Sequence, residues 1–108
     1  FEEVQLIDDA VFAQAYVRSR QEQGKSARLI SRELGQKGVS SEIIDQAVSE
    51  ISQDDEREMV LRLARARWER MAALDRDTRY RRVSGFLMRK GFASGMVSAA
   101  LREVGASD

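Results

Sequence analysis

Apolar residues recur at intervals of three or four through almost the whole chain, which is the spacing of one face of an α-helix. The first apolar stripe comprises Phe12, Ala13, Tyr16 and Val17. It follows Asp8–Asp9, whose carboxylates are suited to cap the free N–H groups at the start of a helix. It ends at Gly24, a residue suited to the left-handed turn that closes many helices. The pattern therefore predicts a helix between these points.

Two further helices are predicted in the first half of the chain. Ser26 precedes a stripe that ends at Gly38, and Ser40 or Ser41 precedes the next, so each begins at a residue that can act as an N-cap. The inward positions of these two helices are predicted to be Leu29, Ile30, Leu34, Ile43, Ile44, Ala47, Val48 and Ile51. Residues 8–53 are therefore predicted to form one three-helix unit.

The second half of the chain repeats the first. A shift of 53 positions relates residues 28–51 to residues 81–104. The identical pairs are Arg28 and Arg81, Ser31 and Ser84, Leu34 and Leu87, Lys37 and Lys90, Gly38 and Gly91, Ser41 and Ser94, Ala47 and Ala100, and Glu50 and Glu103. Because apolar residues also replace apolar ones between these pairs, we interpret the match as an internal duplication.

The opening helix of the second half fits the first half at a different shift, 47 positions. Asp54 or Asp55 is expected to cap it, and the six additional residues are expected around residues 68–73, where they would lengthen its stripe. The shift sets Phe12 on Met59 and Tyr16 on Leu63, and the extended stripe comprises Leu61, Ala64, Trp68 and Met71.

Two more helices complete the second half. Asp77 is expected to begin a helix that ends at Gly91, and Ser94 is expected to begin the last one. The inward positions are Tyr80, Val83, Leu87, Met96, Val97, Ala100, Leu101 and Val104. The predicted fold class is all-α, with two tandem three-helix repeats in 3+3 order. Residues 8–53 and 54–104 form the repeats, residues 1–7 are the remnant of an upstream repeat, and residues 105–108 are a frayed tail.

Composition argues against catalysis. The 108 residues include no histidine and no cysteine, which removes the commonest general base, thiolate nucleophiles and the commonest metal ligands. The pairs Asp8–Asp9 and Asp54–Asp55 could serve acid–base chemistry or a hard metal ion, but each stands where an N-cap is expected, and capping is the favoured interpretation. No phosphate loop, dinucleotide motif or nucleophile elbow occurs. We predict no catalytic, metal or cofactor residues, and no apolar run is long enough to cross a membrane.

Charge is the feature with a functional implication. The chain is neutral overall, but residues 54–108 hold twelve basic and nine acidic side chains, against six and nine in residues 1–53. The candidate contacts for an acidic protein surface or phosphate are Arg18, Arg20, Lys25, Arg28, Arg32, Lys37, Arg65, Arg67, Arg79, Arg81, Arg82, Arg89 and Lys90. A solvated arginine-rich surface is the alternative interpretation. A homeodomain-like basic helix around Thr78–Arg82 is another, although arginine fits phosphate contact better than base readout here. Trp68, Tyr80, Phe86 and Phe92 are expected to serve packing.

Three motifs in combination identify a family. They are LIDD-x-x-FA-x-x-YV-x-x-R at residues 6–20, EL-x-x-KG at residues 33–38, and FL-x-x-KGF at residues 86–92. In this combination the chain resembles the RecX regulatory protein family over essentially its whole length. The resemblance implies tandem three-helix repeats, usually three, in an elongated and curved molecule. This chain has two repeats and begins at Phe1 without an initiator methionine, so we expect a fragment.

The resemblance also implies a function. Members of the family are bacterial cytoplasmic proteins that modulate, and usually inhibit, the RecA recombinase from the groove of the RecA–DNA filament. They suppress strand exchange, ATP hydrolysis and coprotease activity. The expected partner is therefore the RecA filament, with possible contact to DNA phosphate, no membrane and a monomeric state. The alternatives are a stand-alone helical nucleic-acid-binding module and a passive scaffold repeat.

Overall fold

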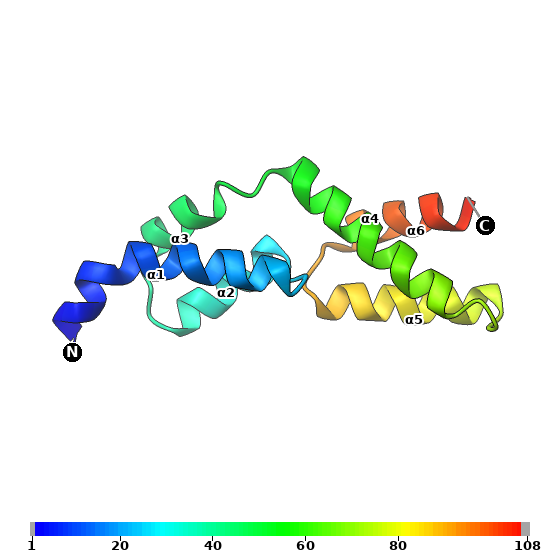
Figure 1. Ribbon diagram of the computed structural model, residues 1–108, viewed down its shortest axis with the longest axis horizontal. Coiled ribbons are helices and arrows are strands. Elements are labelled where there is room, and N and C mark those ends of the chain that lie inside the picture. Colours follow the sequence, from blue (N-terminus) through cyan, green and yellow to red (C-terminus); the bar gives the residue numbers. More distant parts are fainter. Residues whose placement is uncertain (1, 107–108) are drawn as a thin grey trace. The chain divides into compact units, whose positions relative to one another are not determined.

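The computed structural model describes the backbone of residues 2–106 and the side chains of residues 9–106. Within these residues it contains six α-helices and no strand, which confirms the all-α prediction. The helices are α1 (Glu2–Glu22), α2 (Ala27–Gln36), α3 (Ser41–Val48), α4 (Gln53–Arg70), α5 (Arg76–Arg89) and α6 (Ser94–Ala106) (Figure 1). They divide into two compact units, unit 1 (Phe1–Ser52) and unit 2 (Gln53–Asp108), with three helices each.

Unit 1 packs α1, α2 and α3 against one another in all three pairings. Its buried apolar residues are Ala13, Val17, Ile30, Leu34, Val39, Ile44 and Ala47. The predicted inward face is correct at its centre and wrong at one edge, because Phe12 is 42% exposed while its neighbour Ala13 is fully buried. A small residue at the centre of the α1 stripe lets the other two helices approach closely, and the larger ring is left at the side.

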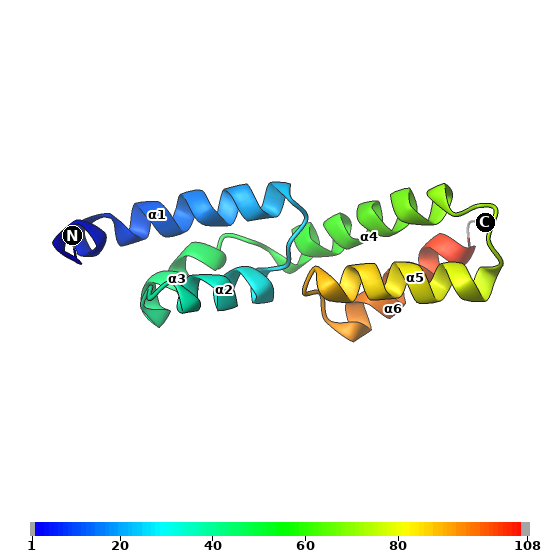
Figure 2. The same cartoon turned by 90° about the horizontal axis from the view of Figure 1, so that it is seen from below.

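Unit 2 repeats this arrangement with α4, α5 and α6, whose mutual packing is visible in Figure 2. Its buried apolar residues are Met59, Val60, Ala64, Trp68, Val83, Leu87, Phe92, Val97, Ala100, Leu101 and Val104. Val60 and Ala64 occupy the positions of Ala13 and Val17 after the predicted shift of 47. Tyr80, expected to point inward, is instead 42% exposed.

The serine caps of unit 1 are confirmed. Ser26 Oγ accepts a hydrogen bond from the Leu29 N–H at 3.1 Å, and Ser40 Oγ accepts one from the Ile43 N–H at 3.4 Å. Both serines have extended backbone angles, as an N-cap requires. The start of α1 is wrong in the prediction, because the helix already includes residues 2–7, which contain no glycine or proline to interrupt it.

The three predicted caps of unit 2 are also wrong, each by one to three residues. Asp54 and Asp55 lie inside the first turn of α4, and Ser94 is the first residue of α6 rather than its cap. The N-cap of α5 is Asp75 and not Asp77, because Asp75 accepts hydrogen bonds from both the N–H and the hydroxyl of Thr78, at 3.1 and 2.7 Å. These hydrogen bonds lower the pKa of the Asp75 carboxyl from its ordinary value.

The second helix of each unit ends in the same way. Gly38 and Gly91 have φ angles of 88° and 96°, in the left-handed region that glycine adopts readily. The N–H of the next residue, Val39 or Phe92, donates to the carbonyl of Leu34 or Leu87, at 3.2 and 3.4 Å. This is the bonding pattern of a Schellman motif. The two glycines thus occupy like surroundings, as the duplication predicts.

The six additional residues of unit 2 do not lengthen its first helix as expected. Helix α4 ends at Arg70, one residue beyond the position equivalent to the end of α1 under the shift of 47. The added length lies mainly in α5, which has 14 residues against 10 in α2 and begins about one turn earlier relative to the shared Leu34 and Leu87 positions. The insertion therefore provides an extra first turn of α5, residues 76–79.

The tail expected from Gly105 also begins later. Helix α6 continues to Ala106, Gly105 is buried, and its carbonyl accepts a hydrogen bond from Arg76 Nη2 at 2.9 Å. Residues 107–108 lie outside the described part of the chain, as do the side chains of Phe1–Ile7 that were expected to belong to an upstream repeat.

Candidate cationic interface

In each unit, one arginine and one lysine lie beside a single aromatic ring of that unit. Arg20 and Lys37 flank the ring of Tyr16 in unit 1, and Arg67 and Lys90 flank the ring of Phe86 in unit 2. The two arginines are related by the shift of 47 and the two lysines by the shift of 53. Four of the predicted contact residues are thus brought together as two equivalent pairs.

In unit 1 the ring comes from the first helix. Tyr16 and Arg20 are four residues apart on α1, so they lie on one face, and the guanidinium carbon is 4.8 Å from the ring centroid. Lys37 Nζ, at the end of α2, is 5.6 Å from the same centroid. Phe12 extends the aromatic surface, with its ring 5.7 Å from that of Tyr16. Both cations lie within the range of a cation–π contact.

A carboxylate neutralises part of this charge. Glu33 accepts a hydrogen bond from the Tyr16 hydroxyl at 2.8 Å and one from Lys25 Nζ at 3.0 Å, and its Oε1 lies 3.5 Å from Arg20 Nε. Burial of Glu33 acts to raise its pKa, but the hydrogen bonds from Lys25 and Tyr16 and the positive charges of Lys25 and Arg20 outweigh that effect, so the pKa is lowered. Glu33 therefore stays ionised at neutral pH and holds these cations in place.

In unit 2 a phenyl ring stands where unit 1 has the carboxylate. Phe86 is the counterpart of Glu33 under the shift of 53, and the Arg67 guanidinium carbon lies 3.9 Å from its ring centroid. Lys90 Nζ is 5.5 Å from the same centroid. Among the described side chains Arg67 has no ion-pair partner, whereas its counterpart Arg20 faces Glu33. Arg67 therefore retains more of its positive charge than Arg20 does.

Of the other nine predicted contacts, Lys25 is engaged by Glu33, and the remaining eight fall into two groups. Seven lie on exposed helix surface, namely Arg18, Arg28, Arg32, Arg65, Arg81, Arg82 and Arg89. The prediction for Arg79 is corrected, because this residue is only 7% exposed and therefore buried. Its Nη2 donates to the Trp68 carbonyl at 2.9 Å, and its guanidinium lies 4.2 Å from the Trp68 ring centroid. Arg79 thus closes the end of α4 and is not available to a partner.

Sequence reasoning missed three residues that organise these sites. Glu33 and Phe86 determine how the equivalent cations are held, and the only sequence signal was that they differ at one aligned position of the repeat. Arg76 was also missed. It bonds the Gly105 carbonyl and lies 5.8 Å from the Trp68 ring centroid, so it and Arg79 close the ends of α6 and α4 from the added turn of α5.

The acidic side chains of the described residues are dispersed rather than clustered. No group of three or more carboxylate, histidine or cysteine side chains converges among them as a metal ion would require. Asp54 pairs with Arg57 at 2.8 Å in an exposed position, so its carboxylate is engaged on the surface of α4. No helix in this part of the chain is long and apolar enough to span a membrane. What recurs is arginine and lysine, whose donors suit carboxylate and phosphate groups.

A tandem array of three-helix units belongs to the class of helical repeat proteins. Comparison with known families gives the specific assignment. Residues 8–48 match the model for the second three-helix domain of RecX, and residues 54–101 match the model for the third. The chain therefore belongs to the RecX family.

Curated relatives and solved structures agree. Regulatory protein RecX of Streptomyces coelicolor is 43% identical over 104 residues, which cover 95% of this chain and 55% of that protein. The Amycolatopsis mediterranei protein of the same name is 39% identical over 99 residues, covering 91% and 57%. This chain thus spans about half the length of these relatives.

Two crystal structures share the fold. RecX from Lactobacillus salivarius superposes with a TM-score of 0.79 at 22% identity, over 96% of this chain and 68% of that one. A second regulatory protein RecX gives a TM-score of 0.74 at 30% identity, over 90% and 48%. The relatives are named regulatory proteins, and the tandem three-helix arrangement is common to them and this chain.

Proposed function

We propose that this chain binds the RecA recombinase–DNA filament in the bacterial cytoplasm and mainly inhibits its strand-exchange, ATPase and coprotease activities. Family membership supports the class of function. The observation that carries the proposal within this chain is the recurrence of an arginine–lysine–aromatic arrangement, with Arg20 and Lys37 at Tyr16 and Arg67 and Lys90 at Phe86.

Repetition suits a polymeric target. A filament presents the same surface on each successive subunit, and equivalent cations in successive units can engage equivalent acidic groups. Once one unit is bound, the other meets its site at high effective concentration, so affinity rises without a new type of contact. The proposed contacts are carboxylates of the recombinase or phosphates of the DNA, which arginine can bind through two parallel hydrogen bonds.

Unit 2 is proposed to contribute more of the binding. Arg67 lacks the carboxylate that holds Arg20. Helix α5 also carries Arg81, Arg82 and Arg89, all exposed. A cation that already has an internal partner gives up that interaction when it binds a new one. Arg67 therefore loses less internal interaction energy than Arg20 when it binds a partner.

The test reverses the charge of Arg81, Arg82 and Arg89 together, each to glutamate. We expect normal helical circular dichroism and loss of inhibition of DNA-dependent ATP hydrolysis by RecA. A matched control reverses Arg62, Arg70 and Arg102, which are also exposed in unit 2 but outside the proposed contact set. Inhibition that survives in the first variant, or is lost equally in the control, contradicts the proposal.

A second measurement separates filament binding from stand-alone nucleic-acid binding. The chain is titrated against bare single-stranded DNA and against RecA–DNA filaments at two salt concentrations. Binding to bare DNA releases counterions and falls steeply with salt. Because the chain has a net charge of zero, we expect weak binding to bare DNA and tighter binding to filaments. Equal affinity for both would favour a nucleic-acid-binding module.

A further inference from the structure

Helix α5 carries two large apolar side chains on its exposed surface. Tyr80 is 42% exposed and Met88 is 47% exposed, although both belong to residue types that helix packing usually covers. They are eight residues apart, so roughly two helical turns, or about 12 Å along the axis, separate them. Ser84 lies midway, and residues at four-residue intervals form one ridge of a helix. Apolar surface is thus exposed on the same helix that holds arginines of the proposed interface.

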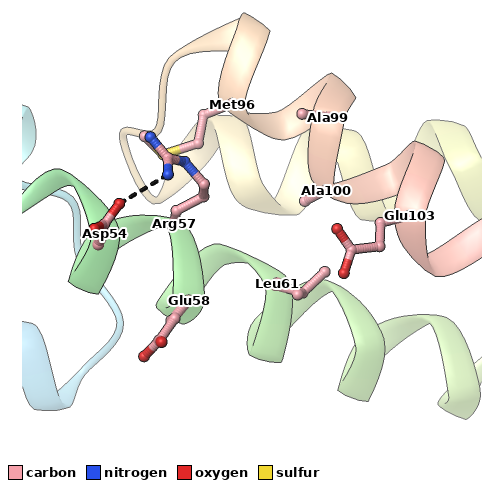
Figure 3. A pocket seen from close by; sticks show the side chains of 8 residues that line it. All are labelled: Asp54, Arg57, Glu58, Leu61, Met96, Ala99, Ala100 and Glu103. Carbon is pink, nitrogen blue, oxygen red and sulfur yellow. Dashed lines mark hydrogen bonds and ion pairs between the residues drawn. The ribbon is translucent and has the colours of Figure 1, made fainter.

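A cationic ridge runs beside the apolar one. Arg81 and Arg89 each follow one residue after an apolar side chain, and Gly85 stands midway between them. The three exposed arginines that follow Tyr80 on α5 have no ion-pair partner among the described side chains, and they are Arg81, Arg82 and Arg89. By contrast, Arg57 on α4 is already paired with Asp54 at 2.8 Å (Figure 3). The arginines of this face of α5 therefore keep their charge for a partner.

Gly85 leaves room between the turns that carry these side chains. A Cβ added there would lie 3.3 Å from Arg89 Nη1 and within 4 Å of no other described side chain. Packing inside unit 2 therefore does not require a glycine here, although glycine disfavours a helix relative to alanine. The two ridges are low at Ser84 and Gly85, so another chain can approach the backbone of α5 between the larger side chains.

Unit 1 does not repeat this face. Under the shift of 53, the counterparts of Tyr80, Gly85, Met88 and Arg89 are Ala27, Arg32, Gly35 and Gln36. Arg81 has the counterpart Arg28, so one positive charge is shared between the units. The combination of apolar and cationic ridges is therefore specific to unit 2, and the repeat fold does not require it.

We propose that this face of α5 docks an acidic amphipathic helix of a protein partner. The partner helix lies along α5 and places apolar side chains against Tyr80 and Met88. Carboxylates on its adjoining stripe meet Arg81 and Arg89, and arginine can bind each through two parallel hydrogen bonds. The partner backbone passes over Gly85. This inference rests on the proposed function, since it names the class of partner for one part of the same cationic surface.

The mixture of apolar and cationic side chains selects this occupant. A nucleic-acid strand would satisfy the arginines, but it would leave Met88 uncovered, and a base could stack only on Tyr80. A purely apolar helix would cover guanidinium groups without giving them partners, which is unfavourable. A helix with carboxylates beside its apolar stripe matches both ridges.

The first test uses a fluorescent helical peptide of about 15 residues, with leucines at i, i+4 and i+7 and glutamates on the adjoining stripe. Neither RecA nor DNA is present, so this result and the ATPase result can fail independently. We expect a Kd below about 1 mM and shifted amide NMR signals at Ser84, Gly85 and Met88. A control peptide with lysine at each glutamate should not bind. A second control, with glutamine at each leucine, should bind at least about fivefold more weakly.

Matched variants separate the apolar contact from charge. The double variant Tyr80→Gln with Met88→Gln leaves every arginine in place, and it should weaken the leucine–glutamate peptide at least about fivefold. The control is Val11→Gln with Phe12→Gln, which removes exposed apolar side chains from unit 1, where Phe12 is 42% exposed. This control should leave binding within about twofold.

A steric pair tests the approach over Gly85. Gly85→Gln should weaken the peptide at least about fivefold. It should also raise the thermal unfolding temperature of unit 2, because glutamine favours a helix more than glycine does. Weaker binding by a more stable variant excludes unfolding as the cause. Gly35→Gln, at a helical glycine of unit 1, should leave the peptide affinity within about twofold.

Three results would overturn the inference. The first is absence of binding by the leucine–glutamate peptide at about 1 mM. The second is equal affinity for the peptide without leucines, or unchanged affinity in Tyr80→Gln with Met88→Gln or in Gly85→Gln, since the face would then attract charge alone. The third is tighter binding of an oligothymidine of about 15 nucleotides at the same amides, which would assign the face to nucleic acid.

Discussion

Unit 1 and unit 2 hold equivalent cations by different means. In unit 1 the carboxylate of Glu33 accepts hydrogen bonds from Tyr16 and Lys25 and pairs with Arg20, where α1 packs against α2. In unit 2 the ring of Phe86 lies beneath Arg67, on the seam between α4 and α5. A carboxylate cancels part of the charge it orders, while an aromatic ring orders a guanidinium and leaves its net charge intact. Under the proposed function, the arginine at this position serves internal pairing in unit 1 and contact with a partner in unit 2.

The units differ again at one buried polar position. Ser26 and Arg79 correspond under the shift of 53, and they are the two buried polar or charged residues in the described part of the chain. Ser26 caps its own helix, whereas Arg79 reaches across to the end of a neighbouring one. The added turn of α5 has thus replaced a local hydrogen bond by a bond between helices. It links the end of α4 to the start of α5 in a way that unit 1 lacks.

The sharpest test of the comparison is the pair Leu34→Ala and Leu87→Ala. Both leucines are fully buried, and a leucine-to-alanine change in a core costs about 3 kcal/mol. Among the described side chains, the core of unit 1 has seven buried apolar residues and that of unit 2 has eleven, so we expect unit 1 to have the smaller reserve of stability. We expect Leu34→Ala to unfold unit 1 and Leu87→Ala to weaken unit 2 without unfolding it.

Two probes distinguish these outcomes. Circular dichroism reports helix in both units, while the fluorescence of Trp68, the only tryptophan, reports unit 2 alone. Leu34→Ala should lower the helical signal and leave the Trp68 emission unchanged. Loss of both signals together would show that the two units unfold as one, and the separate comparison of their cores would fail.

The second test exchanges the buried polar groups. Arg79→Leu removes the donor to the Trp68 carbonyl and the contact with the Trp68 ring, so we expect unit 2 to lose about 2–3 kcal/mol of unfolding free energy. Ser26→Ala removes a cap and should cost unit 1 about 1 kcal/mol. Urea unfolding followed by Trp68 fluorescence measures the first, and amide hydrogen exchange in α2 measures the second. A cost for Arg79→Leu no larger than that for Ser26→Ala would contradict an inter-helix role for the arginine.

The smallest expected effect concerns pH. The folded pKa of Glu33 is lowered, so its contribution to stability is present above the ordinary glutamate pKa of about 4.3 and is lost as pH falls through the folded value. The protection factors for amide exchange in α2 should therefore fall below about pH 4.3 in the native chain, and this fall should be weaker in Glu33→Gln. At neutral pH Glu33→Gln should lower the free energy of unfolding by well under about 1 kcal/mol, because Glu33 and its partners Arg20 and Lys25 are partly exposed. An unchanged acid response in Glu33→Gln would remove Glu33 from its role as the centre of the unit 1 cluster.

Much of the fold followed from the sequence because the duplication constrains it. The shifts of 47 and 53 brought Ala13 together with Val60 and Leu34 together with Leu87, and both pairs are buried. Periodicity identified each apolar stripe but not its edge, so Phe12 was misplaced by one helical position. Cap chemistry pointed to Asp77 at the start of α5, whereas Asp75 is the residue that accepts the hydrogen bonds of Thr78.

The candidate site was only partly predictable. The cations were identified by their charge, and most of them lie on the surface. Arg79 was misassigned because arginine is rarely buried, and its burial depends on the Trp68 carbonyl and ring, which tertiary packing brings to it. The role of Glu33 depends on Tyr16, 17 residues earlier, and no local pattern indicates that hydrogen bond.

The glycine-ended second helix limits where a repeat of this kind can change its length. Lys37 and Lys90 immediately precede glycines with left-handed backbone, and the residues that follow, Val39 and Phe92, are buried. One residue gained or lost between the buried leucine, Leu34 or Leu87, and the lysine would rotate the lysine by about 100° around the helix and away from its ring. The junction between the first and second helices, by contrast, has absorbed six residues while the lysine kept its place. Repeats of this kind can therefore differ in length between their first and second helices. The end of the second helix keeps its length, and the lysine there keeps its position beside the ring.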